Sequence, residues 1–216
     1  MFGHALVAAG LALWLPGLAV TGSARAETLD RIAVSVGQDV ITESKVILDL
    51  RVAAFLDGKP VDLSGAAKRK SAERLVDQLL ILREAVDSHV TLPSVEATAG
   101  LIAPYAAESG YQANLEHYGI SEHDLGAHLL AGLRTLTFTD LRFRPDVLIS
   151  PEDVRSYYDK LSRQPDTKGA PMPSFDESRE QIEKLLVEQR VMEDLDQWLV
   201  MARSAANIRY REKAFE

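Results

Sequence analysis

The hydrophobic positions from Ile32 onwards change from a short alternating pattern to long helical patterns. Ile32, Val34 and Val36 alternate with Ala33 and Ser35, which is typical of a half-buried strand, and 37–39 supplies turn chemistry before Val40. Apolar residues then recur with a helical period in several segments. We expect helices over about 43–56, 66–88, 95–108, 111–118, 122–143, 151–163 and 176–206.

Local capping residues support these boundaries. Thr42 or Ser44, Ser94, Ser121 and Ser150 each stand where a side-chain oxygen can accept an orphan backbone N–H group. Gly119 is a typical residue at a helix end. A final alternating segment, 207–211, can pair with 32–36. Most of the other predicted elements are helices, so the chain is predicted to be mainly α. We expect a bundle of about six helices with a small β element joining the two end strands.

Two helices carry wide apolar stripes that predict their buried faces. In 66–88 the stripe is Leu75, Leu79, Leu82 and Val86, widened by Val76, Leu80 and Ile81. In 176–206 it comprises Ile182, Leu185, Leu186, Met192, Leu195, Leu199 and Ala202. The wide stripe of 66–88 is expected of the central helix of a bundle.

The amino-terminal stretch has the pattern of a secretion signal. An apolar run from Ala5 to Val20 is followed by Ala24-Arg25-Ala26, a small-x-small cleavage pattern. The run is shorter than the roughly 20 residues that a membrane-spanning helix needs. No Lys or Arg precedes it, and a buried helix is the alternative interpretation. The hypothesis is a signal peptide over 1–26, cleavage after Ala26, a periplasmic protein and no stable membrane anchor.

Composition narrows the classes of function. The formal net charge of −8 disfavours nucleic acid and anionic membranes as partners, since both attract Lys and Arg. The chain contains no cysteine, so disulfides and thiolate sites are excluded. The basic run 68–70 is expected to be a solvated patch, and the acidic side chains are expected on the polar faces of helices.

The residues that could take part in catalysis or bind a metal form no known catalytic pattern. His123 and His128 lie five positions apart rather than the four that place two zinc ligands on one helix face. Neither a G-x-S-x-G elbow nor a phosphate-binding glycine loop occurs in the sequence. We therefore predict no catalytic residues, no metal site, no cofactor and no enzymatic activity.

The order of these features resembles the SurA-type periplasmic chaperones. The resemblance begins with DRIAVSVGQDVITES (30–44), where Gly37 stands at a position usually occupied by Asn. It continues through the helix at 75–86, the turn at 91–96, Gly119-Ile120-Ser121, ISPEDVRSYY (149–158) and 175–210, which is nearly all of the chain after residue 26. Many members carry a parvulin prolyl isomerase domain of ~100 residues before their last helix. Here about a dozen residues, QPDTKGAPMPSF, occupy that interval, so the isomerase is expected to be absent.

The resemblance implies a chaperone that holds unfolded polypeptides without ATP. The implied organisation is a SurA-like amino-terminal module over 27–163, a linker over 164–175, and a long helix and strand over 176–216. Clients would be unfolded or nascent exported polypeptides, including outer-membrane proteins, and homo-oligomerisation is left open. Weak candidates for client contact, each with core packing as the alternative, are Phe138, Phe143, Tyr157, Tyr158, Met172 and Trp198. A prolyl isomerase-related enzyme, a hydrolase and a single-partner assembly factor remain alternatives.

Overall fold

The computed structural model describes residues 30–163 and 173–216, which form a mainly α fold with one small antiparallel sheet. The predicted signal peptide (1–26) and most of the predicted linker lie outside the described residues. The strands are β1 (Ile32–Val36), β2 (Asp39–Thr42) and β3 (Ile208–Tyr210). The helices are α1 (Glu43–Asp57), α2 (Gly65–Asp87), α3 (Thr98–Ala106), α4 (Tyr111–Tyr118), α5 (Glu122–Phe143), α6 (Pro151–Ser162) and α7 (Phe175–Ala205), with short 3-10 turns η1 (Val95–Ala97), η2 (Arg144–Asp146) and η3 (Glu212–Ala214).

Local capping explains why the predicted helix boundaries hold. Ser121, Ser150 and Ser174 each form a capping box with the acidic residue three positions later. Gly58 and Gly119 end α1 and α4 in the left-handed conformation. The capping box at Ser174 starts α7 at Phe175, one residue earlier than the predicted 176.

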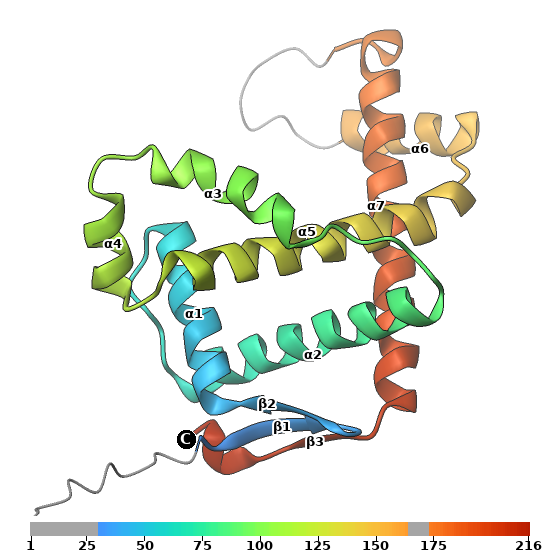
Figure 1. The fold of residues 1–216 in the computed structure, drawn as a ribbon. Helices are drawn as coiled ribbons and strands as arrows, with labels where there is room; N and C mark the ends of the chain where they lie inside the picture. The colour runs from blue at the N-terminus through green and yellow to red at the C-terminus, as the bar shows by residue number, and fades with distance from the viewer. Residues whose placement is uncertain (1–29, 164–172) are drawn as a thin grey trace, which may run out of the picture.

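The helices are arranged around α2 and α5, which lie side by side and are crossed near one end by α7 (Figure 1). α1 stands between the sheet and the start of α5, while α3 and α4 cover the outer side of that end. α6 packs against the first turns of α7, away from the sheet. α7 therefore belongs to both the body and the projecting α6 end.

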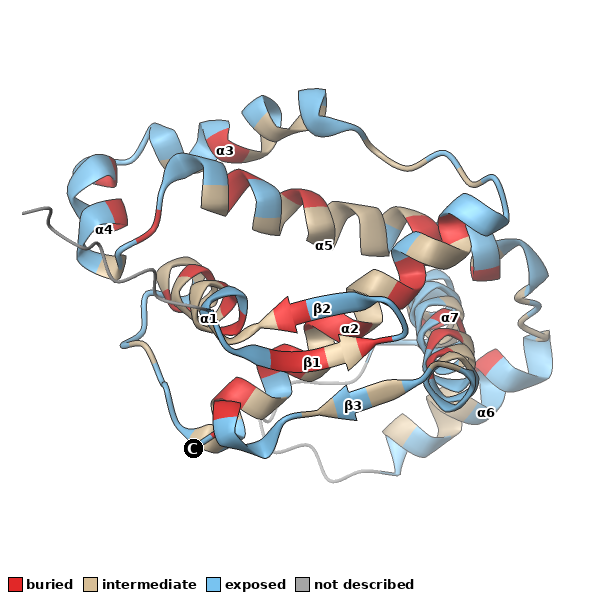
Figure 2. Ribbon diagram, turned by 60° about the horizontal axis from the view of Figure 1, so that its bottom comes forward, coloured by how far each residue is buried: buried red, intermediate tan, exposed pale blue. Residues whose placement is uncertain are grey.

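The sheet joins the two ends of the described chain in the order β2-β1-β3. Val34 pairs with Tyr210 and Val36 with Ile208, which confirms the predicted pairing of the end strands. Ala33, Val34 and Val36 are all buried, whereas Ile32 is exposed, so β1 departs from strict alternation. The register between β1 and β2 shifts between Ile32 and Val34, which interrupts the alternation at that point, and Figure 2 shows the buried residues along this central strand.

β1, β3 and η3 meet the start of α2 in a region that we call the terminal seam. This region contains a buried charged side chain. The Lys68 ammonium lies 3.1 Å from the Glu43 carboxylate and donates to the Glu216 carbonyl oxygen, also at 3.1 Å. Its side chain is only 10% exposed. The prediction of a solvated patch over 68–70 is therefore wrong for Lys68, because the returning tail covers it.

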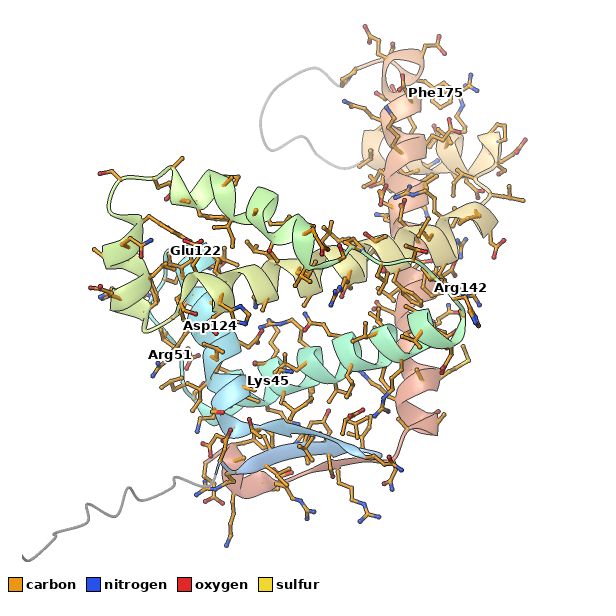
Figure 3. All side chains as sticks on the ribbon, in the orientation of Figure 1. Lys45, Arg51, Glu122, Asp124, Arg142 and Phe175 are labelled. Carbon is orange, nitrogen blue, oxygen red and sulfur yellow. The ribbon has the colours of Figure 1, made fainter. Side chains whose placement is uncertain are left out.

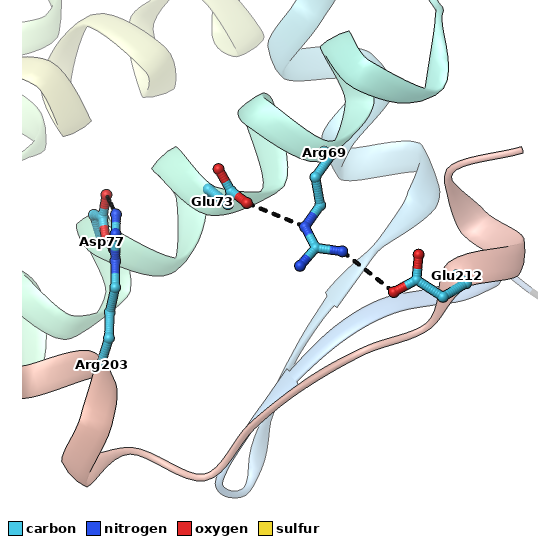
Figure 4. Close-up of polar contacts among 5 residues, drawn as sticks. All are labelled: Arg69, Glu73, Asp77, Arg203 and Glu212. Carbon is cyan, nitrogen blue, oxygen red and sulfur yellow. Dashed lines mark hydrogen bonds and ion pairs between the residues drawn. The ribbon is translucent and has the colours of Figure 1, made fainter. Parts of the chain in front are cut away.

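Ion pairs extend the terminal seam along α2 (Figure 4). Arg69 contacts Glu73 at 3.1 Å and Glu212 at 3.2 Å, and its guanidinium lies 3.7 Å from the centre of the Tyr210 ring. Arg203 at the end of α7 pairs with Asp77, with Nε 2.6 Å from Oδ1. These contacts fix α2 to both the end of α7 and the tail that follows β3.

The buried faces of α2 and α7 differ from the predicted stripes. On α2 the buried apolar residues are Ala72, Leu75, Val76, Leu80, Ile81 and Ala85, while Leu82 and Val86 are exposed. On α7 they include Val191, and Leu185 and Met192 are exposed. Each stripe was predicted too wide because periodicity locates an apolar face but not the angle at which neighbouring helices contact it.

Candidate functional site

A groove of about 410 Å³ opens between α5 and the layer formed by β2, α1 and α2. Its walls expose more apolar than polar surface. Its volume is in the range of ligand-binding pockets, which are mostly apolar with a few polar groups. We therefore take it, and call it the groove, as the candidate functional site.

The floor of the groove combines core residues with side chains that the core leaves partly uncovered. Leu79 and Leu82 of α2 contribute, and Val40 and Ile41 line it from β2. Leu82 is 40% exposed and Val40 is 52% exposed, whereas Leu80 of α2 is 7% exposed. The outward residues of α2 thus provide apolar surface that the fold itself does not bury.

Part of the opposite wall is open because α5 presents small side chains there, between the larger His123, His128 and Arg134. Ala127, Ala131 and Thr135 follow an i, i+4, i+8 spacing, which places them on one helix face. Larger residues at these positions would bring side chains across to α2. The spacing of these small residues is a sequence signal that the apolar stripe of α5 obscured.

One edge of the groove is an unpaired strand edge. β2 pairs only with β1 in the described sheet, and Asp39, Val40 and Ile41 all line the groove. An edge strand presents N–H and C=O groups on its free side, which can pair with another extended segment. The groove thus combines apolar side-chain surface with main-chain hydrogen-bonding groups.

A buried polar cluster beneath the groove connects its two walls. Asp49 of α1 is almost fully buried and accepts hydrogen bonds from Ser71 Oγ at 2.5 Å and from Arg74, both on α2. His128 Nδ1 of α5 lies 3.1 Å from Asp49 Oδ1. Burial by itself would raise the pKa of Asp49, but the bonds from His128 and Ser71 and the charge of Arg74 together lower it below its ordinary value.

This cluster corrects two expectations from the sequence. Asp49 was expected on a solvated helix face, and His128 was expected at the surface or a helix end. Both instead contribute to a contact among three helices, because Asp49 points between α1 and α2 toward α5. The four side chains pair with one another around Asp49, which is the arrangement of a structural ion-pair cluster, although Arg74 Nε is buried without a hydrogen-bond partner among the described residues.

The predicted client-contacting aromatics do not line the groove. Phe138 is fully buried and Phe143 nearly so, and both pack against Trp198 with ring centres 5.4 Å and 6.4 Å away. Trp198 is partly buried against the same cluster. These three rings join α5 to α7, so core packing explains their positions.

Tyr157 and Tyr158 instead lie at the projecting end. Tyr158 donates through its hydroxyl to the Pro173 carbonyl at 2.9 Å, and its ring centre is 5.4 Å from that of Phe175. The Arg155 guanidinium lies 3.7 Å from the centre of the Phe175 ring, which Figure 3 places at the start of α7. Tyr157 is half-buried on the same helix, and Met172 lies outside the described residues. The five candidates that lie in the described residues thus form two separate groups, one in the core between α5 and α7 and one on α6.

Within 30–163 and 173–216, no group of three or more His, Cys, Asp or Glu side chains is placed to hold a metal ion. None of the helices in that part of the chain is long and apolar enough to cross a membrane. The sequence matches no protein-family model and no curated protein to which it was compared.

Proposed function

We propose that this protein is a non-enzymatic chaperone that holds unfolded exported polypeptides without ATP. The observation that carries the proposal is the open apolar groove bordered by the edge strand β2. A holding chaperone needs accessible apolar surface and contacts that tolerate many sequences, because its clients share composition rather than one motif. The groove supplies both kinds of contact.

Client binding at β2 would depend on the main chain. An extended segment added to a sheet edge gains hydrogen bonds that every residue except proline can donate, while neighbouring pockets take alternate side chains. Val40, Leu79 and Leu82 offer such apolar contacts beside the edge. Binding the unfolded form lowers its free concentration and so suppresses aggregation by mass action, with no need for nucleotide.

The proposal includes the location and family of the protein. The resemblance to SurA-type chaperones and the signal-peptide pattern of residues 1–26 support a periplasmic chaperone whose clients include outer-membrane proteins. The short interval after α6 supports a member of that group without a parvulin domain. The α6 end carries half-buried Tyr157 and Tyr158 and remains a second surface for client contact.

The test is suppression of aggregation for several unrelated unfolded proteins, followed by light scattering without nucleotide. We expect near-stoichiometric protection of most clients. Protection of none of them, together with capture of one stoichiometric partner, would favour a single-partner assembly factor. Isomerisation of a proline tetrapeptide that a point substitution abolishes would favour a prolyl isomerase-related enzyme and contradict the proposal.

A further inference from the structure

Some charged side chains around the groove have an oppositely charged partner in the protein, and others have none among the described residues. Lys45 of α1 is exposed at the groove, and it forms no ion pair within the described residues (Figure 3). Arg134 of α5 donates through Nε to the Pro93 carbonyl at 2.8 Å, and its two Nη groups have no protein partner among the described residues. Both cations are thus held at the groove without a carboxylate.

The carboxylates that line the groove are all engaged. Asp39 lies 2.5 Å from the Arg83 guanidinium, and Asp49 is enclosed by the polar cluster beneath the floor. Asp124, which Figure 3 shows at the start of α5, accepts from the backbone N–H and hydroxyl groups of Ser121 in the capping box. Arg83 and Arg74 balance the charges of Asp39 and Asp49, whereas Asp124 is bonded only to neutral groups and keeps its charge. Lys45 and Arg134 therefore leave an excess of one positive charge at the groove, although the whole chain carries a net charge of −8.

The length of the groove along α5 sets the length of the occupant. The lining of α5 extends from His123 to Thr135, which is about 18 Å along a helix at 1.5 Å per residue. An extended strand covers that distance in about five residues at about 3.3 Å each. One short β-like segment therefore spans the groove.

We propose that the groove selects apolar segments of unfolded polypeptide that carry Asp or Glu at their flanks. This inference rests on the proposed function and adds a client preference to it. The apolar floor takes the central side chains, and Lys45 and Arg134 attract the flanking carboxylates. Charge complementarity of this kind determines which partners bind and how fast they associate, more than it raises affinity.

The experiment measures fluorescence anisotropy of two labelled peptides that share one apolar core. One carries two Asp residues at each flank and the other two Lys residues. At low salt we expect the acidic peptide to bind roughly fivefold more tightly, the effect of one or two exposed charge pairs, and the preference to shrink at high salt. Lys45→Glu should abolish or reverse the preference, and Arg134→Gln should reduce it.

Lys70→Glu is the matched control, because Lys70 is an exposed lysine of α2 outside the groove. It should keep the wild-type preference, which separates the local groove charge from the overall net charge. Lys45 is exposed, so Lys45→Glu keeps the test valid even if Arg134→Gln perturbs the fold, as circular dichroism would reveal. Equal affinity for the two peptides, or a preference that survives Lys45→Glu, would overturn this inference while leaving the chaperone proposal intact. Failure of both peptides to bind, with no protection of any client, would overturn both.

Discussion

The terminal seam and the groove both involve α2, but similar residues are buried in one region and exposed in the other. In the terminal seam, Lys68 is enclosed by Glu43 and the returning tail. At the groove, Lys45 is exposed and unpaired within the described residues. Leu80 and Leu82 of α2 differ in the same way, at 7% and 40% exposed. The comparison separates residues that hold the fold together from residues left available to a ligand.

The largest expected effect comes from truncating the two leucines of α2. Leu80→Ala should lower the free energy of unfolding by about 2–5 kcal/mol, because it removes buried methyl groups and leaves a cavity. Leu82→Ala should cost about 1 kcal/mol or less, because much of its side chain already contacts solvent. Urea denaturation of both variants measures the difference. Equal losses would mean that Leu82 is a core residue and that its side of α2 is not open.

The two lysines provide the second comparison. Lys68→Met should lower the free energy of unfolding by about 1–3 kcal/mol, since Glu43 would keep only the more exposed Arg31 as its cationic partner. Lys45→Met should leave the urea midpoint unchanged, because no described contact is lost. A Lys68→Met variant as stable as the wild type would show that the tail does not need this charge.

The buried carboxylate of Asp49, beneath the groove, contributes to the stability of the fold. Its folded-state pKa lies below the unfolded value of about 3.9, so its stabilising contribution is fully present above that pH. The contribution is lost as the pH falls through the lower folded pKa. Asp49→Asn should cost about 1–2 kcal/mol at pH 7 and should flatten the fall in unfolding free energy below about pH 4. If the unfolding free energies of the two proteins fall in parallel at acid pH, another carboxylate controls acid unfolding.

The sequence predicted the elements well where the determining contacts are local. The capping boxes at Ser121 and Ser150 involve residues three positions apart, so their boundaries could be predicted from the printed residues alone. The pairing of 32–36 with the last strand was also confirmed, because both segments alternate and few other strands compete for them.

Prediction failed where the partners are distant in sequence. Lys68 contacts Glu43 and Glu216, and Asp49 contacts Ser71, Arg74 and His128, none of which local periodicity can bring together. The groove was missed for the same reason. Its wall depends on Ala127 and Ala131 facing α2, while the aromatic residues that suggested a binding surface, Phe138 and Phe143, pack against α7.

The central claim, that the groove binds unfolded polypeptide, is tested most directly by filling it. Ala127 is an exposed residue of the α5 wall, so Ala127→Trp would block the groove without disturbing the core. Ala113→Trp adds the same side chain at an exposed position of α4 outside the groove. Aggregation of an unfolded client is followed by light scattering with each variant at equal concentration and equal thermal stability. We expect Ala127→Trp to lose most of its protection and Ala113→Trp to protect like the wild type. Full protection by Ala127→Trp would mean that clients do not bind in the groove.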